Sequence, residues 1–268
     1  MDDIVIPSED LNIKVNEKLF VYALALPVHN VTHKDAIEIS KLLQSVNKDN
    51  IAQTESAIER IVMHPHGRTL WLENRLSLIP CFKDICSIVD FAYISYCRGN
   101  PIGVYFSLLP IVEGIILRWM GIAGARLKFD EIKKWVKNKK NNSQLLNSHP
   151  FAPIWVEALS RILVDEFFKY TGDNPTYAYF NRHAGAHLLQ NFNLNAIRGL
   201  SMRIFIIIEL LVEIYVIENK FIVDSVTIPL LLKNSAETGK RLYAYKLAYD
   251  WLIKPLQEHP EAILGSMY

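Results

Sequence analysis

The chain has 268 residues, half of them hydrophobic and 21% charged, a composition typical of folded globular proteins that excludes an intrinsically disordered one. Its formal net charge of +1 excludes a strongly basic coat of the histone kind, although it is compatible with a local basic patch. The length suits one large domain or two small ones.

Apolar residues recur at three- and four-residue spacing through most of the chain, and Gly and Pro are sparse, so we predict an all-α helical bundle. The expected helices cover residues 16–26, 34–46, 50–63, 69–78, 82–96, 101–120, 129–139, 153–170, 194–217 and 239–257. We expect an N-terminal helical region of unknown role at 1–99, a helical bundle core at 100–220 and a C-terminal helical extension at 221–268.

The sharpest boundary lies at Gly99, Asn100 and Pro101. Gly99 can end one helix in a left-handed conformation, Asn100 can cap the next, and Pro101 suits a first helical position. A second break is expected at residues 64–67, where Pro65 disfavours a helical residue before it and Gly67 permits a tight turn. The His-Pro-His sequence there is either a fragment of a metal site or, in our interpretation, a turn with exposed imidazoles.

Two long apolar runs, residues 106–124 and 204–223, contain ionisable side chains, and such a group near the middle of a membrane span costs about 2.5–3.5 kcal/mol. These side chains are Glu113, Arg118, Glu209, Glu213, Glu218 and Lys220. We therefore expect long buried helices with charges on one side, and no membrane association. The acidic start of the chain and three cysteines without zinc spacing favour a cytoplasmic protein with reduced thiols.

One short segment combines a guanidinium and two imidazoles between two predicted helices, and it reads Asn181-Arg182-His183-Ala184-Gly185-Ala186-His187. Upstream, a predicted helix contains Pro110-Ile111-Val112-Glu113-Gly114. The chain resembles the HEPN superfamily, whose signature is Arg, a polar residue, three further residues and His. It is most similar to a bacterial branch in which a proline-x-x-Glu-Gly helix precedes this signature. The resemblance covers residues 100–217, less than half of the chain.

HEPN proteins have a four- or five-helix core, often pair as dimers, and are in many cases metal-independent endoribonucleases. The resemblance thus implies a ribonuclease that binds RNA, needs no cofactor or metal, and acts as a toxin or in antiviral defence. It also implies a homodimer or higher homo-oligomer, and a protein partner such as an antitoxin is a further possible binding partner. His187 is then expected to move protons near neutrality, and Arg182 to hold the scissile phosphate. His183 and Asn181 are expected to position or polarise these two groups.

Basic residues recur at helical spacing near residues 129–140, among them Lys133, Lys137 and Lys140. They are candidate contacts to an RNA backbone, because Lys and Arg supply much of the affinity for phosphates. The alternative is a solvated helix face.

Glu113 lies within a very apolar predicted helix, where a charge requires a partner. Its candidate partners are Arg118, a cation from another helix, and Arg182. Pairing with Arg182 would make Glu113 a supporting part of the site.

Two alternatives to a nuclease stay open. Leu188 stands where the superfamily usually has Gly, and the N-terminal region has no assigned role, so the chain is also compatible with a non-catalytic HEPN-like module that binds RNA or protein. The other alternative is an unrelated helical interaction protein in which the motif occurs by accident. Arg60 and His66 show that a similar spacing arises by chance, because Pro65 interrupts any helix between them.

Overall fold

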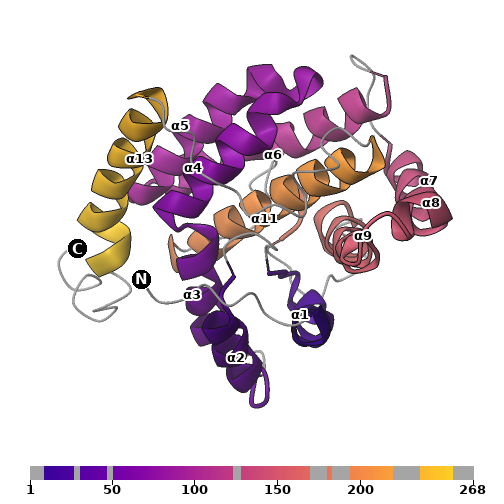
Figure 1. Ribbon diagram of the computed structural model, residues 1–268, viewed down its shortest axis with the longest axis horizontal. Coiled ribbons are helices and arrows are strands. Elements are labelled where there is room, and N and C mark those ends of the chain that lie inside the picture. The colour runs from indigo at the N-terminus through magenta and orange to yellow at the C-terminus, as the bar shows by residue number, and fades with distance from the viewer. Residues whose placement is uncertain are drawn as a thin grey trace.

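The computed structural model describes residues 9–26, 31–46, 51–122, 128–169, 180–182, 194–219 and 236–255. Of these residues 83% are helical and none lies in a strand, which confirms the predicted all-α class. The helices pack into one bundle, and α6 (Pro101–Trp119) and α11 (Leu194–Glu218) run side by side through its middle (Figure 1).

Shorter helices surround this central pair. Before α6 the chain forms α1 (Glu9–Leu19), η1 (Phe20–Tyr22), α2 (His33–Leu42), α3 (Ile51–Val62), α4 (Pro65–Asn74), η2 (Leu76–Leu78), η3 (Pro80–Ile85) and α5 (Cys86–Cys97). After α6 it forms α7 (Phe129–Lys140), α8 (Ser143–Leu146), α9 (Ala152–Ser160), the π-helical continuation η4 (Arg161–Phe167), α13 (Ala236–Ala248) and η6 (Tyr249–Ile253). Figure 1 shows α13 beside α4 at one end of the bundle, and α7 with α8 at the opposite end.

The start of α6 follows from its local sequence. Gly99 has a φ of 77°, the left-handed conformation that ends α5. The Asn100 side chain accepts a hydrogen bond from the Gly103 N–H at 3.0 Å, and Pro101 occupies the first turn. The predicted stop and restart of the chain is confirmed here.

Most side chains of α11 from Ile197 to Ile217 are buried, as expected of a helix that is apolar on nearly all sides. Three of its charged residues lie within about 60° of one another around the helix axis, and each forms an ion pair with α3, α4 or the residue after α4. The pairs are Arg198 with Glu59, Glu209 with Arg68, and Glu213 with Arg75. The N-terminal helices therefore share their core with α11, and the proposed division at 99 and 220 stays a prediction.

Among the described residues one helix, α6, is long and apolar enough by length and composition to cross a membrane. Its most apolar window is 44% buried within the bundle, and the helix packs along α11. One such helix is weak evidence for a span, because the core helix of a soluble protein passes the same test.

For two of the predicted helices that differ from the structure, the physical reason is clear. The first runs from Glu9 to Leu19 instead of 16–26, because the chain turns at Ala23 (φ 52°) and the Leu26 N–H donates back to the Asn16 side chain at 2.8 Å. The buried residues up to Leu26 are thus core residues without being helical. The fourth helix begins at Pro65 instead of 69, since the fixed φ of proline suits a first helical position.

Candidate functional site

The segment before Arg182 is held against the end of η4. The Phe180 ring is fully buried with its centroid 5.5 Å from that of Phe167. The Asn181 side chain has no exposed surface, and its Nδ2 donates to the carbonyl oxygens of Glu166 and Lys169. Because a helix end leaves carbonyl groups without intrahelical partners, Asn181 both caps η4 and fixes the position of the next residue. The role expected of Asn181 toward His187, which lies outside the described residues, stays a prediction.

Arg182 follows in helical conformation, and its Nη2 atom forms an ion pair with Oε2 of Glu113 from the middle of α6. The guanidinium carbon also lies 5.7 Å from the centroid of the Phe168 ring. The Arg182 side chain remains 39% exposed, against 15% for Glu113. The guanidinium is therefore oriented by a carboxylate and a ring and still reaches solvent. Nothing in the sequence indicated the contribution of Phe168, which comes from the path of the chain after η4.

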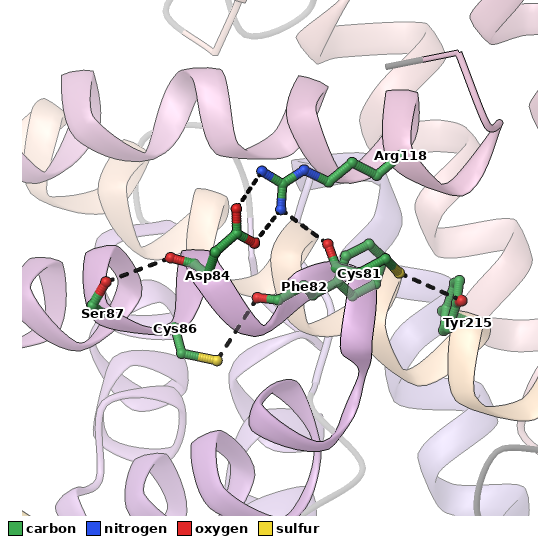
Figure 2. Close-up of polar contacts among 7 residues, drawn as sticks. All are labelled: Cys81, Phe82, Asp84, Cys86, Ser87, Arg118 and Tyr215. Atoms are coloured by element: carbon green, nitrogen blue, oxygen red, sulfur yellow. Dashed lines mark hydrogen bonds and ion pairs between the residues drawn. The ribbon is translucent and has the colours of Figure 1, made fainter. Parts of the chain in front are cut away.

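Of the three partners considered for Glu113, the structure shows Arg182. Arg118 instead forms a two-pronged ion pair with the exposed Asp84 carboxylate and donates to the Cys81 carbonyl oxygen at 2.9 Å (Figure 2). The hydrogen bond from Arg118 lowers the pKa of Asp84. Helix α6 therefore contributes a cation, Arg118, to an ion pair with η3 and a carboxylate, Glu113, to an ion pair with Arg182.

The remaining members of the motif, His183 and His187, lie outside the described residues, as does Leu188. The expected roles of the two imidazoles stay predictions. Within the part of the chain that the structure describes, no group of three or more His, Cys, Asp or Glu side chains is arranged to hold a metal ion.

The candidate lysines lie on α7 and differ in their surroundings. Lys133 and Lys137 are exposed, and the ammonium of Lys133 lies 4.1 Å from the centroid of the Phe129 ring. Lys140 is exposed too, but it forms an ion pair of 2.6 Å with Glu157 of α9. Lys133 and Lys137 are therefore the better placed of the three to meet an external phosphate.

Helix α7 packs against α9, and α9 continues into η4, whose end holds Asn181. Helix α7, which carries Lys133 and Lys137, and the segment with Arg182 therefore both contact the continuous helix formed by α9 and η4. Trp135, which alternates with these lysines in the sequence, is only 8% exposed and packs edge-on against Trp119. Its ring serves the core instead of a nucleic-acid surface.

No known protein family, curated protein or solved structure matches the chain in comparisons of sequence and structure. The interpretation of the site therefore depends on its geometry and on the residue pattern.

Proposed function

We propose that the protein is a metal-independent endoribonuclease of the HEPN type, with Arg182 and His187 as its principal catalytic residues. The observation that carries this proposal is the ion pair between Arg182 and Glu113. The Arg-polar-x3-His segment and the proline-x-x-Glu-Gly helix are the two parts of the resemblance, and the pair joins them although they are far apart in the sequence.

The reaction needs no metal, because RNA carries its own nucleophile. The 2′-oxygen attacks the neighbouring phosphorus, the bond from phosphorus to the 5′-oxygen breaks, and the products are a 2′,3′-cyclic phosphate and a 5′-hydroxyl. His187 takes the proton of the 2′-hydroxyl or returns one to the 5′-oxygen, a task that suits an imidazole near neutrality. Arg182 holds the phosphate and its developing negative charge, with His183 and Asn181 as positioning residues.

The surroundings of Arg182 support this role. A guanidinium carries five N–H donors in a planar fork, more than one carboxylate contact uses. Glu113 and Phe168 orient that fork, while 39% of the side chain remains exposed. Because Arg182 is already held in one orientation, it loses less conformational entropy when it binds a phosphate. Such positioning of a group in advance contributes to catalytic efficiency.

The test is cleavage of single-stranded RNA by the full-length protein in EDTA. His187→Ala should lower the rate by roughly 10²- to 10⁴-fold, the usual contribution of a general acid or base, and Arg182→Ala should also abolish most cleavage. Arg118→Ala is the matched control, because it removes the other arginine ion pair of α6. Full activity in His187→Ala with an intact helical fold would remove the role assigned to this residue.

A non-catalytic HEPN-like module that binds RNA or protein is the second candidate function. The ion pair with Glu113 is compatible with this candidate as well, because it neutralises Arg182 and ties the segment to α6 without requiring catalysis. RNA binding without cleavage by the wild-type protein, or a stoichiometric protein partner, would select this candidate.

We extend the first proposal to a cytoplasmic homodimer or higher homo-oligomer that acts as a toxin or antiviral effector. Dimerisation would bring two copies of Arg182 and His187 to one groove. Light scattering on the purified protein, combined with mixing of active and His187→Ala subunits, tests whether cleavage requires both copies.

A further inference from the structure

A recess with a volume of about 640 Å³ lies between the start of α4 and the C-terminal helices α13 and η6. Its size is within the range of about 300–1,000 Å³ that is common for small-molecule sites. The recess lies on helices other than those that carry Arg182 and Glu113. Sequence analysis singled out the His-Pro-His part of its lining but not the recess itself, because the opposite wall comes from residues 242–254, far along the chain.

Positive charge dominates the walls of the recess. Arg60, Lys246 and Lys254 line it, with Asp250 as the carboxylate among its lining residues. Arg60 is also paired with Glu38, whereas Lys246 and Lys254 are exposed. A concave surface lined mainly by one sign of charge concentrates its field, so this recess attracts anions.

Two imidazoles, His64 and His66, complete the polar lining. Both residues are exposed at their outer edge, and the part of each ring that packs against the protein is desolvated, which lowers the pKa of both. For His64 the neighbouring His66 and Lys246 lower the pKa further while Asp35 raises it. Both rings offer N–H donors in their neutral form. An anion placed between these groups would relieve the repulsion among them.

One side of the recess is suited to a flat ring. The Tyr249 ring lies 6.3 Å from that of His64 between centroids, at an interplanar angle of 59°, and Leu242 adds an apolar side chain to the same lining. Aromatic rings stack on any nucleobase, because every base has a π-face. The recess thus combines cations for a phosphate with rings for a planar group.

We propose that this recess binds a small phosphorylated molecule with a flat ring, of the nucleoside diphosphate class. The lysines and imidazoles contact the phosphates, and Tyr249 contacts the ring. A divalent cation does not suit the same walls, because basic side chains outnumber carboxylates there.

The test is isothermal titration calorimetry on the full-length protein with ADP, inorganic phosphate and adenosine as separate probes. ADP should bind more tightly than either of the other two, because only ADP uses both halves of the recess. The double variant Lys246→Ala/Lys254→Ala should weaken ADP binding about tenfold or more, equivalent to about 1.4 kcal/mol. Lys240→Ala is the matched control, an exposed lysine of α13 outside the recess, and should bind ADP as the wild type does.

A second variant separates the ring from the charges. Tyr249→Leu should lower the affinity for ADP and leave that for inorganic phosphate unchanged, with circular dichroism confirming the fold. The proposal is overturned if ADP does not bind, or if the double lysine variant binds it like the wild type. Binding of single-stranded RNA that the lysine variant weakens, without binding of ADP, would overturn it in favour of a nucleic-acid contact.

Discussion

Arg75 at the end of α4 and Glu213 of α11 form an ion pair in the core, with 3.3 Å between Nε and Oε2 and side-chain exposures of 0% and 3%. The nearby pair of Arg68 and Glu209 is buried in the same way, with 5% exposure on each side. Taking such charges out of water is costly, so each partner is needed to compensate the other. The interface between the N-terminal helices and α11 therefore depends on matched charges as well as on apolar packing.

Glu213→Gln is predicted to destabilise the protein by about 3–5 kcal/mol, because it leaves the buried guanidinium of Arg75 without its carboxylate. Urea denaturation followed by circular dichroism measures the free energy of unfolding. Asp84→Asn is the matched control, since it removes the carboxylate from the exposed Arg118 pair, and its cost should be at most about 1 kcal/mol. Equal small losses in the two variants would contradict the role given to the buried pair.

The sequence predicted those parts of the fold that depend on neighbouring residues. The start of α6 was predicted because Asn100 and Pro101 act within one helical turn. The four-residue spacing of Glu209 and Glu213 predicted charges on one side of α11, but not their partners, because Arg68 and Arg75 come from a distant part of the chain. Pairing of that kind is decided by tertiary packing and has no local signal.

The candidate site was predictable to a similar extent. The residue pattern singled out Arg182 and included it among the candidate partners of Glu113, and the structure pairs the two. Phe168 was missed, because a ring near a guanidinium has no sequence signature at this spacing. The buried position of Asn181 was also not foreseen, since an amide can serve a helix end or a substrate equally well.

Glu113→Gln is predicted to reduce RNA cleavage, by up to roughly 100-fold, because Arg182 loses the charge that orients it and small misplacements of a binding group are costly. The measurement is kcat and KM on a defined RNA in EDTA. Asp84→Asn, which alters the exposed carboxylate paired with Arg118 of the same helix, is the control and should cleave normally. An unchanged kcat in Glu113→Gln would mean that the pair with Arg182 is only structural.

Stability is predicted to fall in mild acid because of His64 and His66. Their pKa values in the folded protein are lowered from 6.5, so below that pH the unfolded chain binds more protons than the folded one. The stabilisation is complete above the unfolded pKa and is lost as the pH falls through 6.5 towards the folded values. Asp35 opposes the shift at His64 and Lys246 adds to it.

Melting temperatures between about pH 7.5 and 5.5 check this dependence. His64→Gln/His66→Gln should lose less of its melting temperature over this interval than the wild type, because glutamine does not titrate. Parallel curves for the two proteins would show that the acid sensitivity comes from other groups.

Lys133→Ala/Lys137→Ala is predicted to weaken RNA binding and to make it less sensitive to salt. Both side chains are exposed one helical turn apart on α7, where they can each meet a phosphate. Each phosphate contact to a single strand contributes about 0.7 to the magnitude of the slope of log affinity against log salt concentration. The slope of the double variant should therefore be smaller in magnitude by about 1.4. Fluorescence anisotropy with a labelled RNA over a range of salt concentrations measures this slope, with the catalytically disabled His187→Ala protein as the background.

Helix α1 offers a matched control for these lysines. Lys14 and Lys18 are exposed, have the same four-residue spacing and also lie on a short helix, but α1 packs against α2 as well as α9. Lys14→Ala/Lys18→Ala changes the net charge by the same amount, so it reveals any effect of overall charge alone. If the two double variants lower the salt slope equally, the α7 lysines contribute only general electrostatic attraction, and the RNA path does not follow α7.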